Sequence, residues 1–132
     1  MTSIQLAKKI TNLIFEKKGY DVKILDLRKL TTMTDYFVIC SADSDTQVKA
    51  IADEVDKNLR DEGIKNWHKE GYQALNWVLI DYVDVIVHVF KKESREFYSL
   101  EKLWGDAPTK EITDPALKPT VKRKPRVAKK TE

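Results

Sequence analysis

The chain has 132 residues, a net charge of +3 and a single cysteine, Cys40. This length suits one domain with a substantial core, and a lone cysteine excludes an internal disulfide and fits a reducing compartment, so we expect a cytoplasmic protein. No apolar run approaches the roughly 20 residues needed to span a bilayer, and the N-terminus lacks the pattern of a signal peptide. We therefore expect no membrane insertion.

Charge and proline are distributed unevenly along the chain. All four prolines lie in residues 107–132, where eight Lys/Arg and three Asp/Glu give a net charge of +5 and leave −2 for residues 1–106. This contrast predicts a folded domain over 1–106 and a disordered, basic Pro/Lys-rich tail over 107–132. The tail is suited to salt-sensitive contacts with phosphate-rich surfaces, although a solvated tail without fixed contacts explains the composition equally well.

Apolar residues at helical spacing predict a first helix over residues 4–14, with Thr2 or Ser3 as its N-cap and Gly19 as a left-handed C-terminal cap. Two strands are predicted next, over residues 22–27 and 36–40. The second is continuously apolar, which is typical of a strand in the middle of a sheet.

A second helix is marked by stronger signals. Ser44 and Gln47 have the spacing of a capping box, an apolar stripe follows from Val48 to Leu59, and Gly63 stands where the helix would end. Residues 67–71 then form a candidate short strand.

Two runs of β-branched and aromatic residues, 77–82 and 85–90, predict a β-hairpin. If Val83 and Asp84 form a two-residue turn, alternate residues fall on opposite faces. One face is almost entirely β-branched and requires burial: Val78, Ile80, Tyr82, Val85, Val87 and Val89. The other face is mixed and pairs Trp77 with Phe90, Leu79 with His88, and Asp81 with Ile86. A three-residue loop would exchange the two faces.

A last helix is predicted from about Ser94 to Trp104, with Phe97, Leu100 and Trp104 on one side. The order of elements is then α-β-β-α-β-β-β-α. This order predicts an α/β or α+β fold in which helices flank a single mixed β-sheet.

The residues that could carry catalysis form no recognisable motif. Cys40 lacks a local motif for an orienting group or an oxyanion hole, and the spacing of His, Cys, Asp and Glu matches no metal-binding pattern. Asp81 and Asp84 would point to opposite faces of a strand, so hydrogen bonds to local turn amides are favoured over metal binding. The four glycines are isolated and form no phosphate-binding loop. We expect no catalytic residue, metal or cofactor.

The C-terminal half of the predicted domain is rich in aromatic residues. On the partly polar face, Trp77 and Tyr98 are expected beside Lys91, Lys92 and Arg95. Aromatic and basic residues together are typical of protein-binding hot spots. Tyr98 is expected at the surface and Trp104 in the core. For Trp77, exposure and coverage by the last helix are equally compatible with the pattern.

Two longer segments carry a specific resemblance: TDYFVICSADSDTQVKAIADEV and EGYQALNWVLIDYVDVIVHVFKKESREFYSLEKLWGDA. They resemble the ribosomal silencing factor, or Iojap, family, and the resemblance covers residues 4–107 with the motifs in the family's order. One departure is Val83, where the family has glycine in the turn sequence D-Y-G-D. A β-branched residue resists positive φ, so the turn could differ in type or register.

The resemblance implies a translational repressor that binds the large ribosomal subunit through its protein number fourteen and sterically blocks association with the small subunit under nutrient limitation. It also implies a nucleotidyltransferase-like fold and a homodimer off the ribosome. The chain lacks the Gly-Ser dipeptide that opens the nucleotidyltransferase motif, so the fold does not imply catalysis. The part of the tail after Pro108 lies outside the resemblance, and the tail could contact ribosomal RNA.

We therefore expect a docking surface on the mixed hairpin face and the last helix. Its aromatic anchors are Trp77 and Tyr98, and Leu79 and His88 are their neighbours on the same patch. Asp81 is an acid that meets a basic group of the partner, and Lys91 and Arg95 are cations at the rim. Two alternatives are a nucleotide-using transferase on the same fold and a homodimeric scaffold that leaves subunit joining unaffected.

Overall fold

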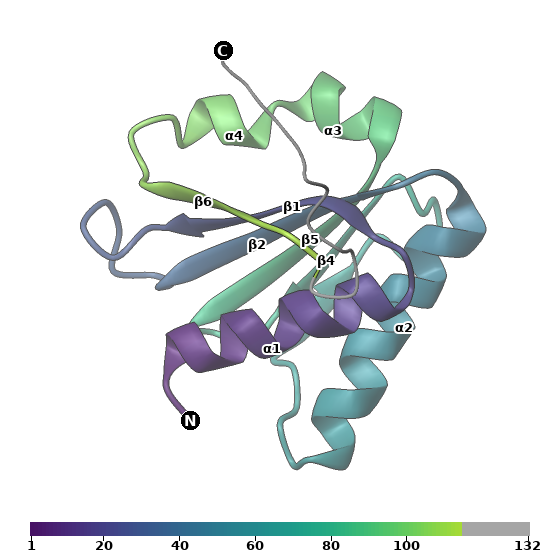
Figure 1. The fold of residues 1–132 in the computed structure, drawn as a ribbon, viewed down its shortest axis with the longest axis horizontal. Coiled ribbons are helices and arrows are strands. Elements are labelled where there is room, and N and C mark those ends of the chain that lie inside the picture. Colours follow the sequence, from purple (N-terminus) through teal and green to yellow (C-terminus); the bar gives the residue numbers. More distant parts are fainter. Residues whose placement is uncertain (115–132) are drawn as a thin grey trace, which may run out of the picture.

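The computed structural model describes residues 1–114 as one mixed sheet with helices on both faces (Figure 1). The strands are β1 (Tyr20–Asp26), β2 (Tyr36–Ala42), β3 (His68–Glu70), β4 (Trp77–Asp81), β5 (Val85–Lys91) and β6 (Thr109–Ile112). The helices are α1 (Ser3–Glu16), α2 (Asp45–Asp61), α3 (Lys92–Tyr98) and α4 (Leu100–Leu103). The strand order is β3-β4-β5-β2-β1-β6, with β2 and β5 parallel and the other neighbours antiparallel. The predicted α+β fold with one mixed sheet is confirmed.

Helix α1 begins as predicted but ends differently. The hydroxyl of Thr2 accepts a hydrogen bond from the Gln5 amide, and the Gln5 side chain accepts one from the Thr2 amide, which completes a capping box. Past the helix end, Lys18 rather than Gly19 adopts the left-handed conformation, with φ of 67°. Gly19 is required for space instead, because a Cβ there would lie 2.3 Å from Cγ2 of Ile14.

Helix α2 is capped by Ser44, whose hydroxyl accepts a hydrogen bond from the Gln47 amide. The Gln47 side chain does not close the predicted box. Its oxygen accepts from the Asp43 amide, and its nitrogen donates to the carbonyl oxygens of Lys17 and Lys18. One side chain therefore fixes the start of α2 against the end of α1. Gly63 adopts φ of 84° just past the helix end.

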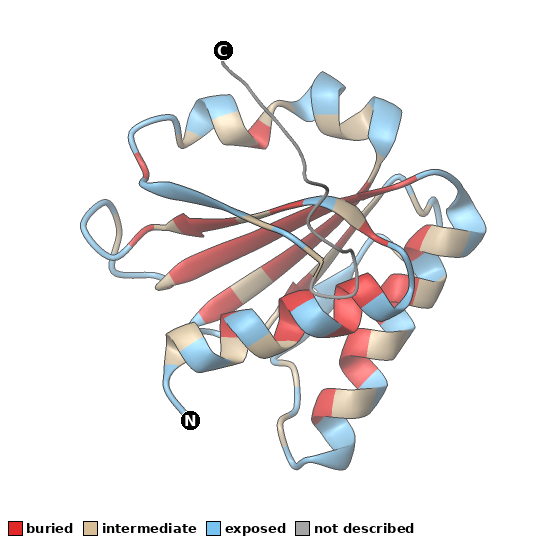
Figure 2. Cartoon of the chain, in the orientation of Figure 1, coloured by how far each residue is buried: buried red, intermediate tan, exposed pale blue. Residues whose placement is uncertain are grey.

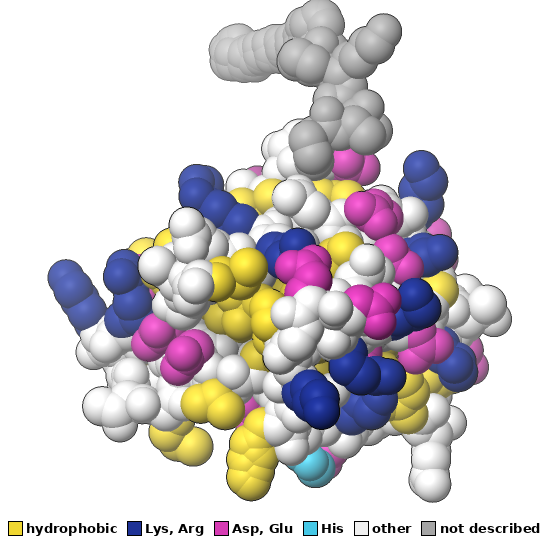
Figure 3. Space-filling view, turned by 90° about the horizontal axis from the view of Figure 1, so that it is seen from below, with side chains coloured by type: hydrophobic (Ala, Val, Ile, Leu, Met, Phe, Trp, Pro, Cys, Tyr) yellow, Lys and Arg dark blue, Asp and Glu magenta, His cyan; other side chains and the backbone are white. Residues whose placement is uncertain are grey.

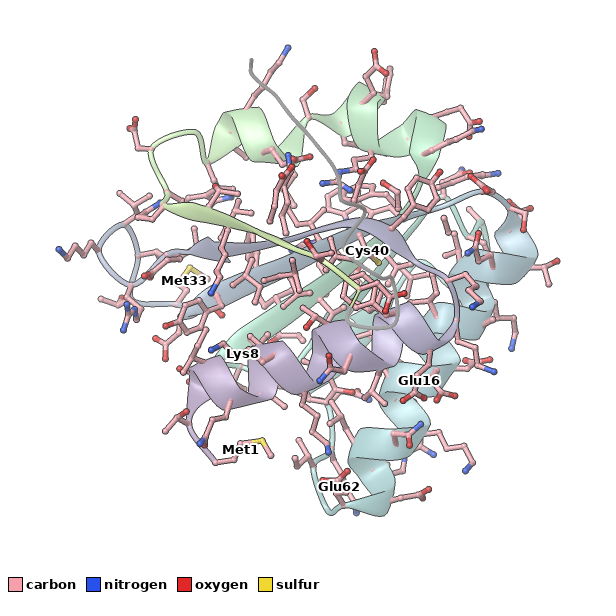
Figure 4. All side chains as sticks on the ribbon, viewed as in Figure 1. Met1, Lys8, Glu16, Met33, Cys40 and Glu62 are labelled. Atoms are coloured by element: carbon pink, nitrogen blue, oxygen red, sulfur yellow. The ribbon has the colours of Figure 1, made fainter. Side chains whose placement is uncertain are left out.

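The sheet has a thick core on one face and a thinner one on the other (Figure 2). Helices α1 and α2 cover the first face, over the β-branched side of the hairpin, which is buried as predicted. Helices α3 and α4 lie over the second face, where Phe37, Ile39, Phe90 and Leu100 form a smaller cluster. Every residue of β2 is buried, including Cys40 in the interior of the molecule (Figure 4).

The hairpin has the predicted two-residue turn and register. Trp77 pairs with Phe90, Leu79 with His88, and Asp81 with Ile86. The turn closes through a hydrogen bond from the Tyr82 amide to the Val85 carbonyl, and the Asp84 amide also donates to the Tyr82 carbonyl. Val83 therefore sits at the centre of a γ-turn with φ of 73°, so the β-branched residue keeps the register but occupies a strained conformation.

The C-terminal part of the fold departs from the prediction in two places. The single helix expected over Ser94–Trp104 is broken at Ser99, whose φ of 49° separates α3 from α4. The expected boundary at residue 106 is too early, because β6 pairs antiparallel with β1 at the sheet edge. The remainder of the predicted tail, 115–132, lies outside the described residues.

Replacing Val83 with glycine is predicted to stabilise the protein by about 1 kcal/mol, because glycine adopts positive φ without a Cβ clash. Equilibrium urea unfolding measures the change. Val83→Ala is the matched control, since alanine retains the Cβ and should gain much less. A Val83→Gly protein no more stable than the parent would show that the turn stores no strain.

Candidate functional site

The seven residues predicted to form the docking surface do not all share one face. Three of them, Trp77, Leu79 and Asp81, lie half-buried along β4 on the side of the sheet covered by α3 and α4. Tyr98, at the end of α3, joins them with 49% of its surface exposed. The other three, His88, Lys91 and Arg95, occupy positions that differ from the prediction.

The aromatic residues form a row that leads from the core to solvent. Trp77 stacks on buried Phe90 with ring centroids 4.9 Å apart and contacts Tyr98 at the same distance. Tyr98 in turn meets the edge of Phe97 at 5.2 Å, and Phe97 is 81% exposed. The continuous helix predicted from the spacing would put Phe97 on the same side as Leu100 and Trp104. The break at Ser99 explains the error, because it separates Phe97 from the turn that carries Leu100.

His88 lies beneath this row and is only 2% exposed, so it is not a surface neighbour of the anchors. Its Nδ1 accepts a hydrogen bond of 3.0 Å from the indole Nε1 of Trp77. Burial lowers the pKa of His88 from its ordinary value of 6.5 to about 3. The imidazole is therefore neutral at physiological pH.

Asp81 has a structural partner as well as an exposed side. Its Oδ1 accepts a hydrogen bond of 2.7 Å from the Val83 amide, as predicted for a turn-flanking acid. On the neighbouring edge strand β3, His68 pairs with Asp81 and Glu70 with Leu79. Directly opposed residues point to the same face, so His68 and Glu70 add a polar rim that the sequence did not reveal.

Lys91 and Arg95 stabilise the fold and are not rim cations. Lys91 lies on the opposite face, where its Nζ is 2.5 Å from Asp45 of α2. Strict alternation along β5 could have indicated this, because Lys91 shares a face with Val87 and Val89. The Arg95 side chain is 11% exposed and donates to Glu101, the Ser41 hydroxyl and the Asp21 carbonyl.

The Arg95 contacts hold α3, and with it Tyr98, on the sheet. Hydrogen bonds from Arg95 lower the pKa of Glu101 to about 2, although partial burial acts to raise it. A hydrogen bond from Lys23 on β1 lowers this pKa further. Helix α3 has no buried residue of its own. Its position therefore depends on this ionic cluster and on the ring contact of Tyr98 with Trp77.

The described residues offer little for catalysis. Burial raises the pKa of the Cys40 thiol to about 12, so the thiol does not form a nucleophilic thiolate at neutral pH. Within residues 1–114, no three His, Cys, Asp or Glu side chains gather so that they could hold a metal ion. No helix in that range is both long and apolar enough to cross a membrane.

Among residues 1–114, the face formed by α1 and α2 is not a basic surface suited to nucleic acid. Along α2, lysines pair with acids one turn away, as in Lys49 with Asp53 and Lys57 with Asp61, and Lys9 of α1 pairs with Glu62. On the face formed by α1 and α2, side chains of both signs are accordingly interspersed (Figure 3). The distinctive surface of the described residues is thus the aromatic row, which is typical of a protein that binds another macromolecule.

Comparisons with known proteins identify the family. The family described as "Ribosomal silencing factor during starvation" matches residues 1–132. The chain is 44% identical over 112 residues to the ribosomal silencing factor RsfS of Halalkalibacterium halodurans, covering 85% of this chain and 96% of that one. The chain belongs to the ribosomal silencing factor family.

A solved structure and a more distant relative extend the likeness. The crystal structure of protein CV0518 from Chromobacterium violaceum matches with a TM-score of 0.78 and 33% identity, covering 88% of this chain and 97% of that one. A mouse protein named "Mitochondrial assembly of ribosomal large subunit protein 1" is 29% identical over 98 residues, covering 72% of this chain and 43% of the mouse protein.

Because His88 is buried, we expect the free energy of unfolding to decrease as the pH is lowered. Its pKa in the folded state, about 3, lies below its ordinary value of 6.5. Between these two pH values the unfolded chain binds a proton at His88 that the folded chain does not bind. The contribution of His88 to the free energy of unfolding is therefore fully present above pH 6.5, and it declines by up to about 1.4 kcal/mol per pH unit below that value. Urea midpoints between pH 7 and 4.5 measure this decline, to which Glu101, with an ordinary pKa of 4.5, adds only near the lower end of the range.

His88→Leu should remove most of the decline, whereas His68→Gln, which changes the exposed histidine, should retain it. A parent protein with the same urea midpoint at pH 7 and pH 4.5 would contradict the assignment of His88 as a buried neutral imidazole.

Proposed function

We propose that this protein represses translation by binding the large ribosomal subunit and sterically blocking its association with the small subunit under nutrient limitation. The single observation that carries the proposal is the row Phe90–Trp77–Tyr98–Phe97, which presents aromatic surface to solvent on a rigid sheet. The proposed contact is protein number fourteen of the large subunit. Membership of the ribosomal silencing factor family supports this proposal, and the name of the mouse relative links that protein to the same subunit.

The physical character of the face suits a basic protein partner. Trp77 and Tyr98 supply large contact areas with few rotatable bonds, so little side-chain entropy is lost on binding. Asp81, farther along β4, and Glu70, opposite Leu79 on β3, place carboxylates on the same face as these anchors. Acids at the edge of an interface favour approach of a basic surface. Docking of a body of this size on the intersubunit face would exclude the other subunit without chemical change.

This mechanism needs no catalysis, and we propose that the protein is not an enzyme. We place it in the cytoplasm, as a homodimer when it is off the ribosome, with a contact between the basic tail and ribosomal RNA as a further element of the proposal. A homodimeric scaffold would self-associate in the same way but would leave subunit joining unaffected.

The aromatic anchors are predicted to dominate binding. Trp77→Ala and Tyr98→Ala should each weaken binding to isolated large subunits by roughly thirtyfold, because truncating a hot-spot residue typically costs about 2 kcal/mol. Co-sedimentation measures the affinity, and circular dichroism confirms that the variants are folded. Trp67→Ala is the matched control, since Trp67 is exposed but lies outside the aromatic row. Parental binding by both folded anchor variants would refute this docking face.

The transferase alternative predicts binding of a nucleotide. An open hollow of about 710 Å³ beside α3 is lined by Arg95, Ser41 and Lys92, among others. Each nitrogen of the Arg95 guanidinium already donates within the protein, so this group does not offer a free phosphate site. Nucleoside triphosphates with Mg²⁺ should therefore leave the melting temperature unchanged, whereas a rise that depends on ligand concentration would favour the transferase.

A further inference from the structure

The buried imidazole of His88 forms one polar contact with the docking face. Its Nδ1 accepts a hydrogen bond from the indole of Trp77, so in the neutral ring the proton resides on Nε2. Within residues 1–114 this Nε2 has no hydrogen-bond partner. The ring of Phe37, 4.5 Å away at an interplanar angle of 70°, offers a weak edge-to-face contact.

Packing alone does not explain a histidine at this position. A leucine would fill a comparable space without a buried, unpaired N–H group and without the stability loss on acidification. The hydrogen bond to Trp77 is the contact of His88 that an apolar side chain could not make. The role of His88 should therefore lie in what this hydrogen bond does to Trp77.

Trp77 would otherwise have two compatible orientations. Its indole stacks on Phe90 and contacts Tyr98, each with centroids 4.9 Å apart, and such ring contacts do not depend strongly on which edge of the indole faces inward. Rotation by about 180° about the outer side-chain torsion would leave the indole in roughly the same plane and turn Nε1 away from His88. The Nδ1 acceptor of His88 favours the orientation in which Nε1 of Trp77 points inward.

We propose that His88 is a positioning residue for docking: its Nδ1 holds the N–H edge of Trp77 inward, so that a purely apolar edge of the indole meets the partner. His88 does not itself touch the partner. This inference rests on the proposed docking role of Trp77, and it implies that the partner surface facing Trp77 is apolar and offers no hydrogen-bond acceptor.

A double-mutant cycle with an NMR readout tests the proposal. Binding to isolated large subunits is measured for His88→Leu, Trp77→Phe and the double variant, and the Trp77 indole N–H resonance is followed by ¹H–¹⁵N NMR. His88→Leu should weaken binding about fivefold, the effect of one neutral hydrogen bond, and shift the indole resonance toward that of a solvated indole. His88→Asn should restore much of the affinity, because its amide oxygen can occupy the place of Nδ1.

In the Trp77→Phe background, which lacks the indole N–H, His88→Leu should cause no further loss. An equal loss in both backgrounds would indicate a general packing effect and overturn the proposal, as would parental binding by a folded His88→Leu protein. Parental binding by both Trp77→Ala and Tyr98→Ala would instead refute the docking face itself, and this proposal with it. The indole resonance still reports in that case whether the hydrogen bond forms in the free protein.

Discussion

The pairing register of β4 with β5 is the constraint on which the rest of the structure depends. Because side chains alternate along a strand, the pairing of Trp77 with Phe90 directs Val78 and Ile80 into the main core and leaves Trp77 on the other face. A slip of one residue would exchange the core face and the proposed docking face. The turn at Val83, held by the Asp81 carboxylate, fixes the register, so one short turn sets both stability and the proposed binding surface.

Sequence patterns predicted those features that depend on residues close together in the chain. The capping of α1 by Thr2, the capping of α2 by Ser44 and the two faces of the hairpin all follow from spacings of a few residues. The break at Ser99 was not predictable in this way, because Arg95 and Glu101 around it pair with each other and with β1 and β2. Strand β6 was missed because only its pairing with β1 orders a short, polar segment in a proline-rich region.

The candidate site residues likewise differ in whether their roles depend on residues close in the sequence or on partners in other elements. Trp77 and Tyr98 were identified from composition, since large aromatic residues in a partly polar context are informative by themselves. The roles of His88, Lys91 and Arg95 depend on partners in other elements, and each proved to support the face from behind or beside it. The resulting surface is small, but a neutral histidine below Trp77 and an ionic cluster under α3 hold its aromatic residues in place. The proposed occlusion would require this positioning rather than reactive groups.

Light scattering of purified ribosomal subunits tests the central claim most directly, because joined ribosomes scatter more than separate subunits. The account predicts that the parent protein, added to large subunits first, reduces the association signal in proportion to its occupancy. The Trp77→Ala variant should require a much higher concentration for the same effect. Full association of subunits in the presence of saturating parent protein would contradict the account.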